Sequence, residues 1–300
     1  MKRFILRIVL FFSIILIADV VLGRLFSFMV SHAVGGDNGR VNYICNQTNE
    51  DMLIFGSSRA NHHYNPQILM DSLSLSVYNC GEDGNGIILN YGRLLMIEQR
   101  YMPKYIIYDV SCGFDLETND NHKYIGKLKP YYERKGIKDV FVSVDMTEKW
   151  KMLSQLYRYN SSFLTVFDDY LHPNQSMGFQ GYRPYEGKMD VRTINSKKEF
   201  KKHVEYDSLK LAFMAKFIEH CNDVKMIFAV SPVWYGRDTK RLRPVIDLCK
   251  QHGILFLDFS NDSKFVHNNE YFKDDYHLNA QGADEFTKDL IQELRMREII

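Results

Sequence analysis

The feature of this 300-residue sequence that most restricts its fold is the alternation of short apolar runs with longer stretches of helical periodicity. Short apolar runs predict buried strands, because a strand covered on both faces has no polar side to expose. Five runs qualify: MLIF from Met52, SVYN from Ser76, YIIYDV from Tyr105, VKMIFAV from Val224 and GILFLDF from Gly253. Helix-like stretches stand between or after them, including ILNYGRLLMIEQRY, YDSLKLAFMAKFIEHC, TKRLRPVIDLCKQHG and NAQGADEFTKDLIQELRMR. This order predicts an α/β fold with a parallel sheet covered by helices on both faces.

Small and polar residues follow the first two predicted strands. The first strand passes through Gly56 into Ser57 and Ser58, in FGSSR, which predicts a tight turn that starts a helix. The second is followed by YNCGEDGNG, whose glycines let backbone amides approach a bound group. Ligands of parallel sheets bind beyond the carboxyl ends of the strands, so both segments are expected to face one crevice.

The segment after the fifth strand, FKDDYHLNAQGA, adds a histidine to the same edge. Asp274 stands three residues before His277, so one turn of chain can bring the carboxylate to one imidazole nitrogen while the other faces the crevice. A serine, a glycine-lined anion pocket and an aspartate-oriented histidine form the arrangement used for acyl transfer.

The three segments resemble the sequence blocks of the SGNH (GDSL-like) hydrolases and acyltransferases, and read here FGSSR, NCGEDG and DDYH. The resemblance implies a flavodoxin-like three-layer sandwich with a central parallel five-stranded sheet, and an esterase or O-acyltransferase that needs no cofactor and no metal. It implies Ser58 as nucleophile, and Asp274 with His277 as orienting acid and base. The amides of Ser58 and Gly84 are expected to serve the oxyanion hole.

The third block of that family, G-x-N-D, has no asparagine in this chain, which reads YDVSCGFD at the corresponding place. Loss of one oxyanion donor typically lowers the rate by about 10²–10³, so we expect Asn85 or another group to substitute. Membrane-anchored relatives that acylate cell-surface polymers look similar and have degenerate third blocks. The resemblance therefore implies a glycan or acylated polymer of the cell envelope as substrate, with a membrane acyl-donor protein as a further partner.

The N-terminal segment, MKRFILRIVLFFSIILIADVVLG, predicts a transmembrane helix. Lys2, Arg3 and Arg7 precede its apolar part, and this charge distribution holds the N-terminus in the cytoplasm and the rest of the chain outside, in the periplasm or at the cell surface. Only Ile8–Ala18 is free of charge, and Val21–Gly23 could serve as a cleavage site, so a signal peptide remains the alternative to an uncleaved anchor.

The predicted domain organisation follows from these patterns. Residues 1–23 form the anchor, 24–50 a linker and 51–300 the α/β domain, in which 117–201 is an inserted lid or substrate-binding region. The insert is rich in aromatic residues, which stack on sugar rings and acyl chains but more often pack a core.

One further segment, SPVWYGR, follows the fourth predicted strand and so reaches the same edge of the sheet. We expect Trp234, Tyr235 and Arg237 to line the acceptor side of the crevice.

Composition and spacing exclude several other functions. With 38 basic and 37 acidic residues, no overall charge favours nucleic acid. The five cysteines contain no C-x-x-C pair and are expected in the core, with one disulfide left open. His62 and His63 are adjacent and cannot easily face one metal, so they are expected in a surface loop.

Each motif also has a structural explanation. Ser57 and Ser58 could cap a helix, and the aspartates before His277 could start one in solvent. A catalytically inactive protein of the same fold, which binds envelope carbohydrate or assists assembly, is therefore the alternative function. The missing asparagine of the third block is its main support.

Overall fold

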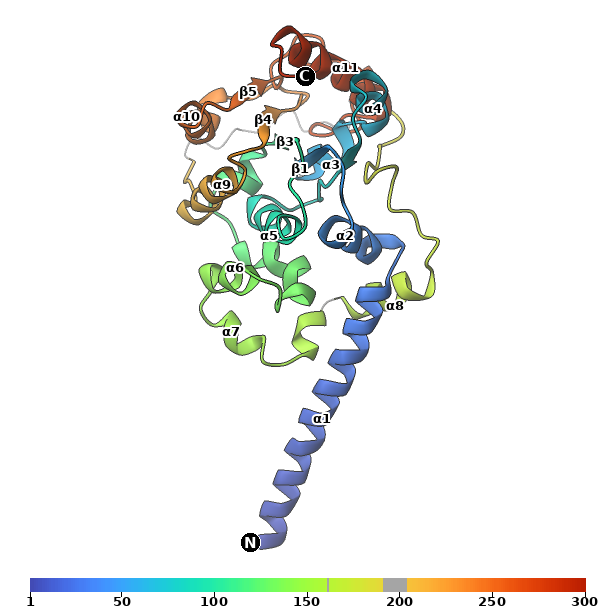
Figure 1. Cartoon of the computed structure of the whole chain (residues 1–300), viewed down its shortest axis with the longest axis vertical. Coiled ribbons are helices and arrows are strands. Elements are labelled where there is room, and N and C mark those ends of the chain that lie inside the picture. The colour runs from blue at the N-terminus through green and yellow to red at the C-terminus, as the bar shows by residue number, and fades with distance from the viewer. Residues whose placement is uncertain (161, 191–203) are drawn as a thin grey trace. The chain divides into compact units, whose positions relative to one another are not determined.

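The structure is a computed structural model that describes residues 1–160, 162–190 and 204–300 (Figure 1). Contacts between Cα atoms divide the chain into two compact units. The first contains residues 1–47 and 125–177, and the second, called here the sheet unit, contains residues 48–124 and 178–300.

The sheet unit is built on a five-stranded sheet of order β2-β1-β3-β4-β5. Its strands are β1 (Met52–Gly56), β2 (Val77–Asn79), β3 (Tyr105–Asp109), β4 (Lys225–Val230) and β5 (Leu255–Asp258). All four pairings are parallel. This is the strand order of flavodoxin-like doubly wound sheets, so the predicted fold and all five predicted strands are confirmed.

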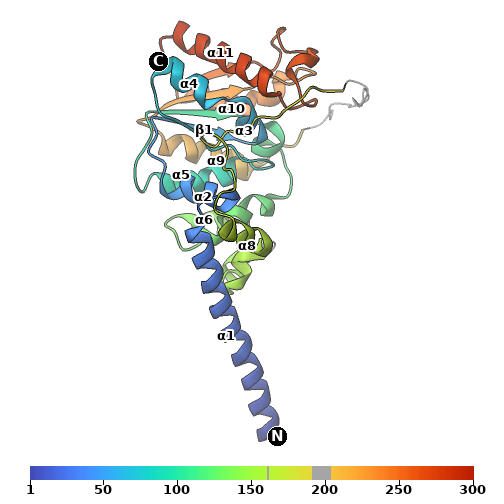
Figure 2. The same cartoon turned by 90° about the vertical axis from the view of Figure 1, so that its right-hand side faces the viewer.

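Helices cover both faces of this sheet, and Figure 2 shows α4 and α11 over one face and α5 and α9 over the other. The helices of the sheet unit are α3 (Ser58–His63), α4 (Pro66–Leu73), α5 (Ile87–Ile97), α9 (Ser208–His220), α10 (Arg243–Gln251) and α11 (Ala280–Met296). Shorter turns are the π-helical η1 (Cys112–Leu116) and the 3-10 helices η5 (Thr239–Leu242) and η6 (Asn269–Tyr271).

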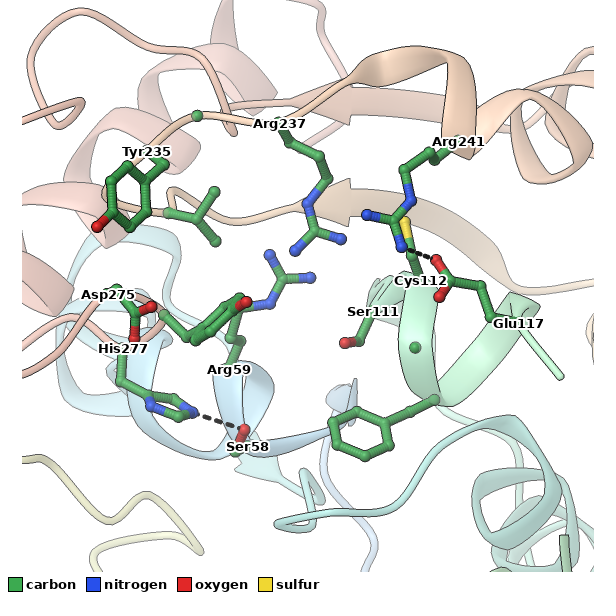
Figure 3. Close-up of a pocket in the computed structure, with 15 residues that line it drawn as sticks. Ser58, Arg59, Ser111, Cys112, Glu117, Tyr235, Arg237, Arg241, Asp275 and His277 are labelled. Atoms are coloured by element: carbon green, nitrogen blue, oxygen red, sulfur yellow. Dashed lines mark hydrogen bonds and ion pairs between the residues drawn. The ribbon is translucent and has the colours of Figure 1, made fainter. Parts of the chain in front are cut away.

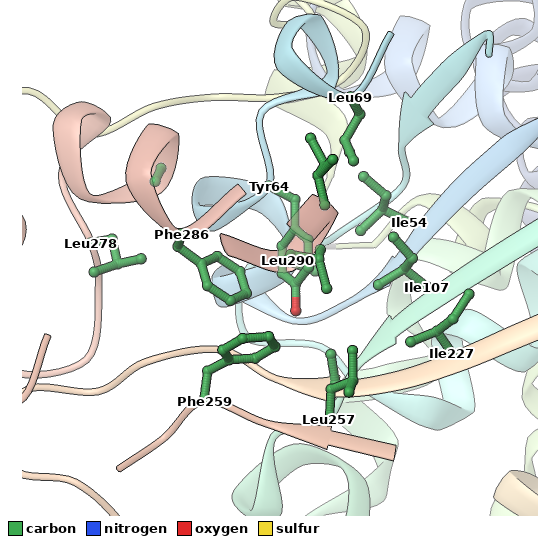
Figure 4. Close-up of a cluster of buried hydrophobic side chains, with 14 of the residues drawn as sticks. Ile54, Tyr64, Leu69, Ile107, Ile227, Leu257, Phe259, Leu278, Phe286 and Leu290 are labelled. Carbon is green, nitrogen blue, oxygen red and sulfur yellow. The ribbon is translucent and has the colours of Figure 1, made fainter. Parts of the chain in front are cut away.

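The core alternates between the two faces with the period of two that a strand imposes. Ile54 lies in a buried cluster with Leu69 of α4 and Leu290 of α11 (Figure 4). The next residue, Phe55, points to the opposite face, where its ring centroid lies 5.4 Å from that of Phe217 in α9. Strands buried on both sides explain the continuous apolar runs of the sequence.

All five cysteines are buried with free thiols, in agreement with the expected core positions. The sheet unit contains four of them, namely Cys80, Cys112, Cys221 and Cys249. Because all five thiols are free, no disulfide joins any two of the five cysteines.

The first unit is helical and starts with α1 (Lys2–His32), a 31-residue helix. An 18-residue window of α1 has a mean hydropathy of 2.7 and none of it is buried, as in a membrane anchor or a signal sequence. The remaining helices of this unit are α2 (Gly36–Asn46), α6 (Ile137–Val144), α7 (Glu148–Lys151), the 3-10 helix η3 (Leu156–Tyr159) and α8 (Phe163–Leu171). The 3-10 helix η2 (Asn121–Tyr131) leads from one unit to the other along the chain.

The C-terminal half of α1 packs within the first unit. Phe26, Met29 and Val30 form a buried cluster with Tyr159 and Val166. The segment 24–50, which the sequence predicted as a linker, thus contains the end of α1 and all of α2.

The predicted insert, 117–201, is divided between the two units. Residues 117–124 and 178–190 belong to the sheet unit, and the stretch between them belongs to the first unit. Residues 161 and 191–201 of this insert lie outside the described residues.

Candidate active site

The turn after β1 has a backbone that requires glycine. Gly56 has φ of +141°, and a Cβ there would lie 2.6 Å from the carbonyl oxygen of Asp109. The chain then enters α3, with Ser57 before the helix and Ser58 as its first residue. Ser57 is buried and makes no side-chain cap, and its Oγ has no hydrogen-bond partner among the described residues. The capping explanation therefore fails for Ser57.

The hydroxyl of Ser58 instead meets a histidine from the other end of the chain. Its Oγ lies 2.8 Å from Nε2 of His277, as the dashed line in Figure 3 shows. The Nδ1 of the same ring lies 2.9 Å from Oδ2 of Asp274. The structure thus brings together the three residues that the sequence predicted as nucleophile, base and orienting acid.

The loop before α11 holds this arrangement locally. Oδ1 of Asp274 accepts hydrogen bonds from the backbone amides of Tyr276 at 2.8 Å and of His277 at 2.9 Å. Burial would raise the pKa of the Asp274 carboxyl, but the hydrogen bond and charge of His277, with these amides, hold the pKa below its usual 3.8. An ionised Asp274 accepts the Nδ1 hydrogen, which leaves Nε2 as an acceptor for the serine hydroxyl.

A second histidine, His63, holds the loop before α11 through hydrogen bonds. The amide of Leu278, next to His277, donates to Nε2 of His63 at 3.0 Å, and Nδ1 of His63 bonds Oγ of Ser231 at 2.9 Å. Burial, with the nearby charges of His277 and Arg59, lowers the pKa of His63 well below its usual 6.5. A neutral His63 therefore ties the end of β4 to the loop that carries His277.

The expectation that His62 and His63 lie in a surface loop is wrong. Both are buried in α3, which packs against β1 and α11. The cause is long-range, because α11 comes from the C-terminal end of the chain and covers a helix that directly follows the first strand.

The ring of His62 also contacts an aromatic residue. Tyr185 stacks on His62 with ring centroids 3.8 Å apart, and its ring centroid lies 5.5 Å from that of His277. Burial, with the charges of Asp83 and Asp274, raises the pKa of the Tyr185 hydroxyl. Tyr185 thus contacts the rings of both His62 and His277.

Ser58 and His277 open into a pocket of about 560 Å³ (Figure 3). Of the three residues predicted to bind substrate, Tyr235 and Arg237 line this pocket. Trp234 does not line it, because its ring packs against the core and its Nε1 donates to Oδ1 of Asn269 at 2.8 Å. The whole lining consists of Ser58, Arg59, Ser111, Cys112, Gly113, Phe114, Glu117, Val233, Tyr235, Gly236, Arg237, Arg241, Asp275, Tyr276 and His277.

The other predicted oxyanion donors lie on the turn after β2. Neither Gly84 nor Asn85 lines the pocket. The amide of Asn85 donates to the carbonyl of Glu82 at 3.1 Å, and its side-chain nitrogen donates to the carbonyl of Asp83 at 2.8 Å. Their participation in an oxyanion hole stays a prediction.

Ser111 and Arg59 are two of the pocket residues that were not identified from the sequence. Ser111 follows β3, in the segment where the G-x-N-D asparagine is missing, and lines the pocket together with Ser58. Arg59 follows the predicted nucleophile directly, and its guanidinium forms a 3.0 Å ion pair with the buried Asp109 at the end of β3. The position of Ser111 in YDVSCGFD is a signal that could have identified it.

Metal ligation is a further chemistry to consider for this pocket. Across the described part of the chain, no three His, Cys, Asp or Glu side chains of the lining come close enough together to share an ion. The polar groups that converge on Ser58 are those of an acid–base arrangement.

No protein-family model matches this chain, and no curated protein is similar to it in sequence. Several solved structures are similar to it, and three of them are described here. A protein from Bacteroides fragilis assigned as an acylhydrolase is 13% identical, with a TM-score of 0.39 over 92% of this chain and 96% of its own. A Desulfitobacterium hafniense protein assigned to the lipolytic G-D-S-L family is 12% identical, with a TM-score of 0.37 over 79% of this chain and 96% of its own.

The third similar structure is an acetyl xylan esterase from Butyrivibrio proteoclasticus. It is 10% identical, with a TM-score of 0.37 over 82% of this chain and 63% of its own. At these identities and TM-scores, the three structures assign no activity to this chain.

Proposed function

We propose that this protein cleaves or transfers an ester-linked acyl group through a covalent acyl-enzyme on Ser58. The observation that carries the proposal is the continuous set of hydrogen bonds from Ser58 Oγ to His277 Nε2, at 2.8 Å, and from His277 Nδ1 to Asp274, at 2.9 Å. Nucleophile, base and orienting group within hydrogen-bond reach are the geometric requirement for this chemistry.

In the first half-reaction, Ser58 Oγ attacks the carbonyl carbon of the ester while His277 Nε2 takes the hydroxyl proton. The tetrahedral intermediate collapses when the carbon–oxygen bond to the alcohol breaks, and His277 returns the proton to the leaving alcohol. In the second half-reaction, water or a sugar hydroxyl gives its proton to His277 and attacks the acyl carbon. Ser58 then leaves with that proton, which restores the starting state.

Asp274 acts on the imidazole and not on the substrate. Its carboxylate fixes the ring tautomer and stabilises the imidazolium that forms in each half-reaction. The lowered pKa of Asp274 supports this role, because the carboxylate stays ionised throughout the neutral range.

For the oxyanion, we propose the backbone amide of Ser58 and the hydroxyl of Ser111 as donors. The first amides of a helix have no partner within the helix, and Ser58 is the first residue of α3. Ser111, the residue before η1, lines the pocket and stands in for the missing asparagine. Gly84 and Asn85 remain predicted donors that a closed, substrate-bound state would have to bring nearer.

The N-terminal helix supports a proposal for the substrate class. With Lys2, Arg3 and Arg7 before the apolar stretch of α1, we propose an anchored enzyme that faces the periplasm or cell surface and acts on an envelope glycan or polymer. A reporter enzyme that is active only outside the cytoplasm, fused after Ile300, should be active. Activity of a cytoplasm-only reporter at the same place would contradict the orientation.

The activity itself is tested with the full chain in a non-ionic detergent and 4-nitrophenyl acetate as substrate. We expect hydrolysis by the unmodified protein and none by Ser58→Ala. Addition of a sugar acceptor separates the two reactions, because a transferase forms the acylated sugar and a hydrolase forms free acetate. A folded protein without hydrolysis or transfer would favour the non-catalytic binding protein.

A further inference from the structure

The pocket beside Ser58 contains more cationic than anionic side chains. Three arginines line it, Arg59, Arg237 and Arg241, together with two carboxylates, Glu117 and Asp275. Among the described residues, the lining therefore has one more arginine than carboxylates.

Two of the three arginines form an ion pair with a carboxylate. Arg59 pairs with the buried Asp109 at 3.0 Å, and Arg241 pairs with Glu117. Arg237 forms no ion pair with any carboxylate of the residues that the structure describes. Within the described part of the chain, the charge of Arg237 is thus not neutralised by an ion pair.

The backbone holds Arg237 firmly in this place. The amide of Arg237 donates to Oδ1 of Asn261 at 2.9 Å, and Nδ2 of Asn261 donates back to the carbonyl of Arg237 at 2.9 Å. Gly236 has φ of +70°, and a Cβ there would lie 2.4 Å from Oδ1 of Asn261. The turn after β4 is therefore fixed, and it directs the Arg237 side chain into the pocket (Figure 3).

The guanidinium groups of Arg237 and Arg59 point toward one another in Figure 3, and the two charges interact. Burial, with the like charge of Arg59, lowers the pKa of the Arg237 guanidinium. Asp109 offsets the charge of Arg59, but the partly desolvated charge of Arg237 costs free energy as long as no anion pairs with it. A bound anion would remove this cost, because the planar guanidinium fork binds carboxylate or phosphate through two parallel hydrogen bonds.

We propose that the ester substrate carries a carboxylate or phosphate group, and that Arg237 binds this group while Ser58 attacks the ester. The proposal rests on the proposed function of Ser58 and specifies its substrate as an anionic ester. Phe114 and Val233 line the same pocket and supply apolar contacts for the uncharged part of the substrate.

The test measures inhibition of 4-nitrophenyl acetate hydrolysis by anions that lack an ester. Inorganic phosphate and succinate represent the two anion chemistries, and succinamide is the neutral control. We expect competitive inhibition by at least one anion and none by succinamide. Arg237→Gln should raise the inhibition constant by about 10- to 100-fold, as expected for the loss of a bidentate charge-assisted contact.

Arg243→Gln is the matched control, because this arginine lies on α10 with 82% of its side chain exposed. Its inhibition constant should equal that of the unmodified protein. If Arg237→Gln does not fold, Arg237→Lys takes its place, because it keeps the positive charge but lacks the planar guanidinium group. Arg237→Lys should raise the inhibition constant less than the about 10- to 100-fold expected for Arg237→Gln. Equal inhibition constants for the unmodified protein and the Arg237 variants, or equal inhibition by succinamide, would overturn the proposal.

Calorimetric binding of the same anions to Ser58→Ala separates this proposal from the proposed function. If the unmodified protein hydrolyses no ester but anion binding depends on Arg237, the anion site is supported and the acyl-transfer function is rejected. Ester hydrolysis that neither anion inhibits, without anion binding to Ser58→Ala, would reject the anion site alone.

Discussion

Ser58 and His277 are separated by 219 residues in the chain, yet the serine Oγ lies 2.8 Å from the imidazole Nε2. The contact depends on the parallel sheet. Ser58 follows β1, and His277 lies in the loop between β5 and α11, so both stand beyond the carboxyl ends of their strands. Residues at one edge of such a sheet meet, whatever their distance in sequence.

Asp274 and its neighbour Asp275 should differ sharply in their effect on turnover. Asp274→Asn leaves the His277 ring without its carboxylate, so we expect kcat for ester hydrolysis to fall by roughly 10²- to 10⁴-fold. Asp275→Asn is the matched control and should lower kcat less than about tenfold, within about 1.4 kcal/mol. A larger effect of Asp275→Asn would mean that Asp275, and not Asp274, orients the base.

The ionisation of Asp274 also links stability to pH. Because its pKa lies below 3.8 in the folded protein, its carboxylate contributes stability above pH 3.8, and this contribution is lost as the pH falls through the folded-state value. The difference in urea midpoint between the unmodified protein and Asp274→Asn should therefore stay constant from neutral pH to about pH 4 and shrink below it. A difference that grows on acidification would contradict this.

His63 should matter for both stability and reactivity, although it does not face the pocket. His63→Leu removes the acceptor of the Leu278 amide and the partner of Ser231. We expect the free energy of unfolding to fall by roughly 1–3 kcal/mol, because a buried donor is left unsatisfied. We also expect a fluorophosphonate probe to label Ser58 more slowly, because the loop that carries His277 is no longer held by His63.

His252→Leu is the control for this variant, because His252 lies at the exposed end of α10. It should change neither quantity. Normal labelling of Ser58 in a destabilised His63→Leu protein would show that His63 only supports the fold.

The parts of the site that could be predicted from sequence are those encoded locally. Gly56 and Ser58 are two residues apart after an apolar run, and Asp274 and His277 are three residues apart. A single turn of chain joins the two residues of each pair, so their spacing in the sequence already determines how the two residues lie relative to one another. The five strands were predicted for the same reason, since burial on both faces leaves a continuous apolar run.

The remaining features depend on contacts between distant segments. His62 and His63 are buried because α11 covers α3, and the sequence near these histidines does not predict that contact. Trp234 and Arg237 belong to one short segment, yet one packs against the core and the other lines the pocket. Which side chain turns inward is decided by the partners Asn261 and Asn269, far along the chain.

The central claim is that Ser58 is a nucleophile activated by His277, and a fluorophosphonate probe tests it most directly. Peptide mapping of the labelled full chain should place the probe on Ser58. The label should be lost in Ser58→Ala and in His277→Ala, and kept in Ser57→Ala, whose buried Oγ makes no hydrogen bond among the described residues. Label on Ser57, label that persists without His277, or an unlabelled but folded protein would contradict the account.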